Sequence, residues 1–66
     1  MIINLYIYER ERGYMAESAE LCINSNIPEL AATPIEFWGS DIRSIVDDVK
    51  AYARAKGLSG RIHLIK

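Results

Sequence analysis

The chain has 66 residues, 50% of them hydrophobic, and its 8 basic and 9 acidic residues give a formal net charge of −1 at pH 7. This composition predicts one globular domain over residues 1–66 and excludes disorder; it also argues against non-specific nucleic-acid binding, which needs a basic surface to displace counterions from phosphates. The longest apolar runs fall short of the ~20 residues of a membrane helix, and the N-terminus lacks the features of a signal peptide, so we expect no membrane association.

A domain of this size has a small core, which rarely contributes more than ~3–5 kcal/mol of net stability. Small natural proteins usually add disulfides, a metal ion or a second subunit. Because the chain has one cysteine, Cys22, and one histidine, His63, we expect no internal disulfide, no metal site and no cofactor. A homodimer or a protein partner is therefore expected, and a marginally stable monomer remains the alternative. The free thiol fits a reducing cytoplasm.

Residues 2–9 alternate with the two-residue period of a β-strand. One face carries Ile3, Leu5 and Ile7, and the other carries Ile2, Asn4, Tyr6 and Tyr8. Because both faces are largely apolar, we predict that this strand is central in its sheet. The charged residues 9–12 and Gly13 then predict a hairpin turn.

Residues 14–23 are the predicted return strand. One of its faces carries Met15, Ala19, Leu21 and Ile23, and the other carries Tyr14, Ala16, Ser18, Glu20 and Cys22. Glu17 disagrees with the apolar set, and a bulge near Ser18 would remove the conflict. A loop is predicted over residues 24–32, where Pro28 could begin one helical turn.

Residues 33–38 predict a third strand, with Ile35 and Phe37 facing inward and Glu36 and Trp38 facing outward. Pro34 cannot donate a hydrogen bond to a neighbouring strand. The strand therefore lies at a sheet edge, or Pro34 is its first residue.

Residues 40–57 predict a helix over about residues 41–56, with Ser40 as its N-cap and Asp41 behind it at the positive end of the dipole. Its apolar face comprises Ile42, Ile45, Val46, Val49, Tyr52 and Ala53. Gly57 predicts a left-handed C-terminal stop. The outer face carries a stripe of small residues with flanking carboxylates: Ser44, Ala51 and Ala55, with Asp47 and Asp48. This stripe is either a solvated surface or a place where another element approaches closely.

Residues 61–66 predict a last strand, with Ile62 and Leu64 inward and His63 and Ile65 on the other face. The order is therefore β-β-β-α-β, in the α+β class. A right-handed crossover places the last strand parallel to the first, which predicts a four-stranded mixed sheet of order 3-2-1-4. One helix covers one face of this sheet. The other face is then the first interface candidate, formed by Tyr6, Tyr8, Tyr14, Trp38 and Ile65.

Catalytic groups are not expected in this fold. No serine, cysteine or lysine has a base at a recognisable spacing, and there is no glycine-rich phosphate loop. The ribonuclease H fold begins with the same element order. In that fold, carboxylates on the first strand, the first helix and the fourth strand bind two metal ions. Asn4 is the polar residue of the first strand here, and residues 62–65 contain no carboxylate. We therefore expect a non-enzymatic version of that half-fold.

Residues 13–21, GYMAESAEL, resemble the G-Y-x-A-E-x-x-E-L signature on the second strand of HicB-like antitoxins. Residues 38–41, WGSD, are similar to the start of that family's helix, whose apolar spacing is followed by Ile42, Ile45, Val46 and Val49. This resemblance covers roughly residues 3–56. It implies a degenerate ribonuclease-H-like β-β-β-α-β unit that neutralises a toxin by covering its active surface, often as an oligomer.

The chain departs from that family in two places. The family's Pro-Gly turn between the second and third strands is replaced by the longer loop of residues 24–32. The C-terminal DNA-binding segment of many such antitoxins is missing, so we expect neither operator binding nor autorepression.

These observations predict a non-enzymatic, cytoplasmic, antitoxin-like inhibitor that binds a partner protein, with a homodimer as the expected assembly. One alternative is a phage or mobile-element inhibitor of a host defence complex, similar to an anti-CRISPR protein. Another is a purely structural, oligomer-forming protein. A neighbouring toxin gene would favour the antitoxin, and neighbouring phage structural genes would favour the defence inhibitor.

Overall fold

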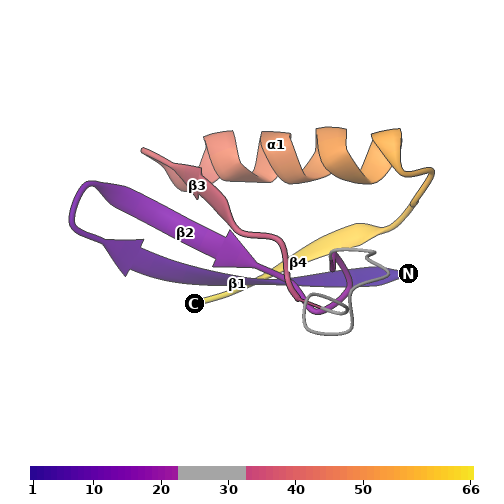
Figure 1. Ribbon diagram of the computed structural model, residues 1–66, viewed down its shortest axis with the longest axis horizontal. Helices are drawn as coiled ribbons and strands as arrows, with labels where there is room; N and C mark the ends of the chain where they lie inside the picture. Colours follow the sequence, from indigo (N-terminus) through magenta and orange to yellow (C-terminus); the bar gives the residue numbers. More distant parts are fainter. Residues whose placement is uncertain (23–32) are drawn as a thin grey trace.

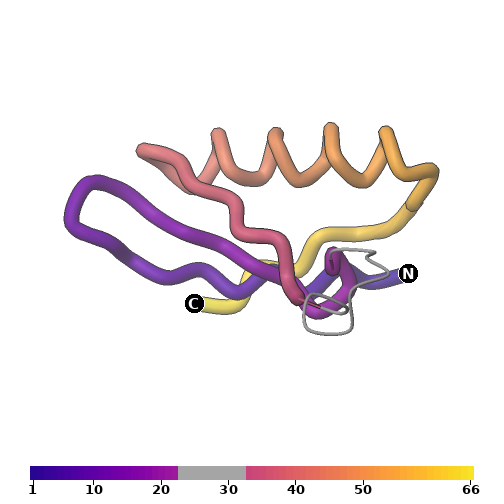
Figure 2. Tube along the Cα trace, in the orientation of Figure 1, coloured from indigo at the N-terminus to yellow at the C-terminus, as the bar shows by residue number. Residues whose placement is uncertain are grey.

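The structure, a computed structural model, describes residues 1–22 and 33–66. Its elements are β1 (Ile2–Arg10), β2 (Gly13–Glu17), β3 (Phe37–Gly39), α1 (Ile42–Ala55) and β4 (Arg61–Ile65). The strands form one sheet of order β3-β2-β1-β4, and α1 lies across one of its faces (Figures 1 and 2). β1 is antiparallel to β2 and parallel to β4, and β3 is antiparallel to β2. The predicted element order and sheet order are confirmed. The predicted loop over residues 24–32, including Pro28, and the predicted strand residue Ile23 lie outside the described residues.

The core lies between β1 and α1. Ile3, Leu5 and Ile7 of β1 face the helix, and all three are buried against Ile45 and Val49 of α1. Burying one such aliphatic side chain contributes ~1.5–3 kcal/mol. These five residues therefore hold the helix on the sheet, as the strand and helix periodicities predict.

A two-residue turn at positions 11 and 12 joins β1 to β2 and sets their register. Glu9 lies opposite Tyr14, and Tyr8 lies opposite Met15. Because Glu9 has the same parity as the buried Ile7, Tyr14 lies on the side of the sheet that α1 covers, where it packs against the core. The prediction that Tyr14 belongs to the uncovered face is therefore wrong. Composition alone placed the turn but did not fix its length, and the length decides which residues share a face.

β2 ends at Glu17 in a turn, where the sequence predicts a longer strand with a bulge. The amide of Leu21 donates to the carbonyl oxygen of Ser18 at 3.1 Å. This turn interrupts the strand alternation, so Leu21 enters the core whereas Met15 faces the opposite side of the sheet. The predicted common face of Met15 and Leu21 is wrong. Glu17 lies on the same side as Met15, away from the core, and the conflict at this residue disappears.

β3 lies at the edge of the sheet, as its proline predicts, although it is shorter than expected. Pro34 precedes it, in an isolated antiparallel bridge with Cys22. Phe37 faces the helix and Trp38 faces away from it, as predicted. The Phe37 ring meets Tyr52 of α1 edge to face, with ring centroids 5.8 Å apart at 79°. This contact anchors the edge strand to the helix.

α1 is capped by Asp41, and the prediction of Ser40 as the N-cap is wrong. Asp41 has an extended backbone, and its Oδ1 accepts a hydrogen bond from the amide of Ser44 at 2.7 Å. That hydrogen bond lowers the pKa of the Asp41 carboxyl. Serine and aspartate are both favoured caps. The position of the first helical residue, Ile42, decides between them.

The C-terminus of α1 has the two hydrogen bonds of a Schellman motif. The amide of Leu58 donates to the carbonyl of Ala53 at 2.8 Å, and the amide of Gly57 donates to the carbonyl of Arg54 at 3.1 Å. Gly57 has φ 71°, the left-handed conformation that the sequence predicts. Within residues 1–22 and 33–66, no helix has the length and apolar character that crossing a membrane requires.

Candidate protein-binding face

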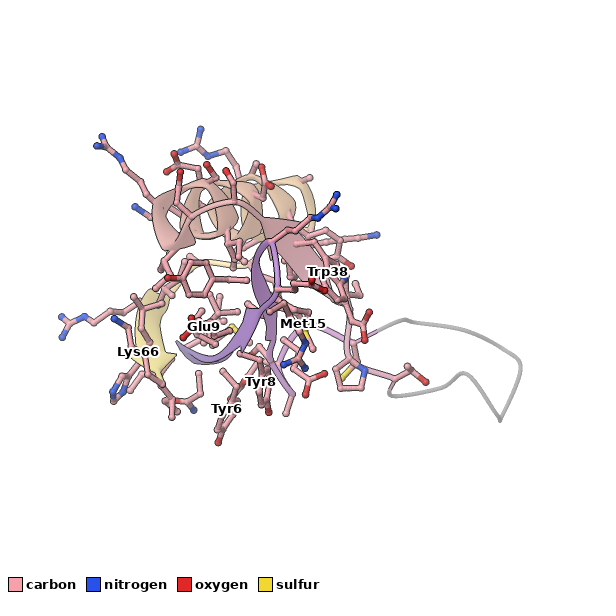
Figure 3. All side chains as sticks on the ribbon, turned by 90° about the vertical axis from the view of Figure 1, so that its left-hand side faces the viewer. Tyr6, Tyr8, Glu9, Met15, Trp38 and Lys66 are labelled. Atoms are coloured by element: carbon pink, nitrogen blue, oxygen red, sulfur yellow. The ribbon has the colours of Figure 1, made fainter. Side chains whose placement is uncertain are left out.

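The face of the sheet that α1 leaves uncovered is called the open face below. The strand registers place the following residues on it: Ile2, Asn4, Tyr6, Tyr8 and Arg10 of β1, Met15 and Glu17 of β2, Trp38 of β3, and Arg61, His63 and Ile65 of β4. Tyr6 and Tyr8 project from the sheet on the side opposite the helix (Figure 3). The open face is therefore a continuous surface built on four paired strands.

Large apolar side chains on the open face remain in contact with solvent. The exposed fraction is 57% for Ile2, 42% for Tyr6, 38% for Tyr8 and 57% for Trp38. An aromatic side chain contributes roughly 150–250 Å² when fully buried. Together these four side chains therefore expose a few hundred Å² of surface, an amount comparable to the largest apolar patches on soluble proteins, which are often functional.

The centre of the open face is a row of three side chains on three strands. Met15 of β2 pairs with Tyr8 of β1 on one side and with Trp38 of β3 on the other. Met15 is only 7% exposed, although α1 lies on the opposite side of the sheet. Two exposed rings therefore flank a buried side chain on the open face.

Polar contacts orient the two rings at the ends of this row. The guanidinium carbon of Arg10 lies 5.4 Å from the centroid of the Tyr8 ring, within cation–π range. The indole nitrogen of Trp38 donates to Oε1 of Glu36 at 3.3 Å. Tyrosine, tryptophan and arginine are the residues most enriched in the energetic centres of protein interfaces. Holding them in place before binding lowers the entropy lost in a complex.

A polar network lies where the chain turns after β2. Nδ2 of Asn4 donates to Oε1 of Glu20 at 3.2 Å, and Oγ of Ser18 donates to Oε2 of the same carboxylate. Ser18 is fully buried, and its Oγ also accepts from the amide of Glu20 at 3.3 Å. The hydrogen bond from Ser18 lowers the pKa of Glu20, and the one from Asn4 acts in the same direction. These bonds engage both oxygens of the carboxylate and tie β1 to the turn, which is a structural role.

The described residues offer few groups for chemistry. In residues 1–22 and 33–66, His, Cys, Asp and Glu side chains do not gather into a group of three that could hold a metal ion. His63 is exposed on the open face, and Sγ of Cys22 donates to the carbonyl of Ala19 at 2.9 Å.

The structure separates the predicted interface residues into two groups. Tyr6, Tyr8 and Trp38 lie together on the open face, and Tyr14 lies on the other side. The second group is exposed on α1: Ser44, Asp47, Asp48, Ala51 and Ala55. Because α1 covers the opposite side of the sheet, this group and the open face cannot belong to one flat contact surface.

The predicted interface set omits several residues of the open face, among them Ile2, Arg10 and Met15. The alternation of β1 already placed Ile2 on the same face as Tyr6 and Tyr8, and extending it by two residues would have added Arg10. Met15 could not be found in this way, because its position depends on the length of the hairpin turn.

Comparison of the chain with models of protein families, with curated proteins and with solved structures finds no match. The fold defines a small α+β protein in which one face of a mixed sheet is covered by a helix and the other presents aromatic side chains.

Proposed function

We propose that this protein is a non-enzymatic inhibitor that binds a partner protein through the open face and covers the partner's functional surface. One observation carries the proposal: Tyr6, Tyr8 and Trp38 are exposed together on a paired sheet. Desolvating large aromatic side chains is a main source of affinity in protein interfaces. The chain thus presents the chemistry of a binding surface.

The partner in this proposal is a toxin, in an antitoxin-like pair. The support is the resemblance of residues 13–21 to the HicB-like signature. Several residues of that segment have structural roles here: Gly13 has φ 144°, Tyr14 packs against the core and Ala16 is fully buried. The segment therefore builds the hairpin that carries the open face. The free thiol of Cys22 supports a reducing compartment such as the cytoplasm.

The test captures the partner with two matched variants of the tagged protein. Trp38→Ala removes an exposed ring from the open face, and Ala51→Arg alters the exposed outer side of α1 by a comparable amount. We expect the wild type and Ala51→Arg to capture the same partner and Trp38→Ala to lose it. Capture of nothing but the protein itself would reject the proposal.

The captured partner is then purified and titrated with each variant. Truncating an energetically dominant aromatic residue of an interface costs about 2 kcal/mol or more, so Trp38→Ala should weaken Kd by about 30-fold. The partner's own activity should fall in proportion to the complex formed. Full activity in the saturated complex would show binding without inhibition. A toxin as the partner supports the antitoxin, whereas a component of a defence complex supports the alternative inhibitor.

A further inference from the structure

Among the strands that the structure describes, β4 has an unpaired backbone edge. It ends the sheet on the side opposite β3, and within the described residues no strand lies beyond it. The amide of Arg61 donates to the carbonyl of Met1 at 3.1 Å, so Arg61 directs its backbone groups toward the first strand. Successive residues of a strand direct their N–H and C=O groups to opposite edges. Ile62 and Leu64 therefore direct theirs outward, where each group needs a partner.

The two edges of the sheet differ in their protection against further pairing. β3 has only three residues. Pro34, which precedes β3, forms an isolated antiparallel β-bridge with Cys22. β4 has five residues and contains no proline. Short length and proline are devices that prevent edge-to-edge association. Of the two edges in the described part of the chain, the β4 edge is thus the less protected against pairing with another strand.

The helix does not cover the apolar layer completely at this edge. Leu64 lies on the helix side of the sheet, yet it is 38% exposed. Between α1 and β4 there is a groove of about 380 Å³, lined by Val46, Lys50, Gly60, Arg61, Ile62 and Leu64. An additional strand at this edge would give the exposed leucine an apolar neighbour.

We propose that β4 pairs antiparallel with β4 of a second copy of this chain, about a twofold axis that is perpendicular to the sheet and passes midway between the two His63 residues. The two sheets then form one continuous sheet, with both helices on one side and both open faces side by side on the other. This interface uses none of the exposed aromatic rings. The dimer therefore stands independently of the proposed function, and it doubles the surface available to a partner.

The side chains of β4 favour this register over its neighbours. Centred on His63, it places Ile62 opposite Leu64 of the second copy, and both residues have outward backbone groups to exchange. An axis through Leu64 would place Ile62 opposite Lys66, and an axis through Ile62 would place Leu64 opposite Gly60. Either shift leaves one cross-strand apolar pair, Leu64 with Leu64 or Ile62 with Ile62, in place of two, and such pairs are the unit of sheet stabilisation.

The charge around this edge is basic, from Lys50, Arg61 and Lys66. In the proposed register Arg61 lies opposite Ile65 of the second copy, so the two arginines do not meet. The remaining repulsion is screened by salt, and the dimer should tighten as ionic strength rises. An acidic strand of another protein at the same edge would behave in the opposite way, because salt would weaken that complex.

Site-directed cross-linking tests the register in a Cys22→Ser background. Directly opposite residues of a non-hydrogen-bonded antiparallel pair have Cα atoms ~4.5 Å apart, which a disulfide can bridge. His63→Cys should therefore give a disulfide-linked dimer under mild oxidation. In the matched control Ile65→Cys, the two cysteines lie four residues out of register, ~14 Å apart, and should not cross-link. Equal cross-linking of both variants, or of neither, would overturn the proposal.

Light scattering tests the same interface without cross-linking. Leu64→Lys replaces a half-exposed side chain at the edge, so the fold should persist by circular dichroism while the mass falls to that of a monomer. Tyr6→Glu on the open face should leave the dimer intact. A monomeric wild type at about 1 mM, a concentration that populates even weak dimers, would refute the proposal. A mass lowered by Tyr6→Glu and unchanged by Leu64→Lys would place the dimer on the open face instead.

Discussion

Gly13 at the start of β2 lies directly against Gly39 at the end of β3. A Cβ atom added to Gly13 would lie 2.4 Å from the carbonyl oxygen of Gly39, closer than two such atoms approach in proteins. Gly13 also has φ 144°, a conformation that residues with a side chain rarely adopt. The hairpin and the edge strand therefore meet at a point where only hydrogen fits.

Gly13→Ala should destabilise the fold more than the same change at Gly57. Gly57 has φ 71° and nothing within 4 Å of an added Cβ, so Gly57→Ala has only the backbone cost of about 1–2 kcal/mol. Gly13→Ala adds the clash with Gly39 to a similar backbone cost. Urea denaturation of both variants measures the difference. Equal losses would mean that the approach of the two strands relaxes freely.

Asp41→Ala should lower Tm by about 4–8 °C, the effect of losing one helix cap in a domain of this size. The carboxylate of Asp41 satisfies the amide of Ser44, which would otherwise lack a partner in the first turn of α1. Ser40→Ala is the matched control and should leave Tm nearly unchanged. Thermal melts followed by circular dichroism compare the two. A larger loss for Ser40→Ala would identify Ser40 as the cap.

The stability of the protein should depend on pH through Glu20. Its pKa in the folded state is lowered from the ordinary value of 4.5, chiefly by the hydrogen bond from Ser18. As pH falls, the Glu20 carboxylate of the unfolded chain is therefore protonated at a higher pH than that of the folded protein. The stabilisation is present above pH 4.5 and is lost as pH falls through the lower folded-state pKa. Because Glu20→Gln has no charge to lose, its unfolding free energy should fall less between pH 6 and pH 3. Parallel profiles would contradict the prediction.

Phe37 and Tyr52 should be energetically coupled. Their edge-to-face contact joins the edge strand to the helix, and such pairs contribute about 0.5–1.5 kcal/mol beyond the area they bury. A double-mutant cycle with Phe37→Leu and Tyr52→Leu isolates this contribution, because leucine keeps most of the apolar volume. Strictly additive losses of unfolding free energy would show that the geometry of the rings adds nothing.

The order of elements and of strands could be predicted because it depends on periodicities that run over many residues. The alternation along β1 and the apolar arc of α1 each repeat several times, and the handedness of the crossover then places β4 beside β1. The end of β2 could not be predicted in this way. It depends on one hydrogen bond, from Leu21 to Ser18, that joins residues three apart.

The open face was predicted in part, for the same physical reason. Tyr6 and Tyr8 lie on a strand whose two faces can be assigned from the strand alone. Tyr14 and Met15 lie on a strand whose faces depend on its pairing, and a change of one residue in the turn exchanges them. Which residues of one strand share a face can thus be read from that strand alone. Which residues of two paired strands share a face depends on the length of the turn between them.

The parallel pairing of β1 and β4 brings together positions 2 and 61, which lie 59 apart in the sequence. Closing a loop of that length costs ~3.5 kcal/mol of chain entropy, whereas the β1–β2 hairpin closes across two residues in microseconds. During refolding, the edge of β1 that pairs with β4 therefore stays unpaired after the hairpin has formed. A strand from a neighbouring molecule can pair with that edge before β4 does. The yield of refolded protein should fall with protein concentration even when the folded state itself is stable.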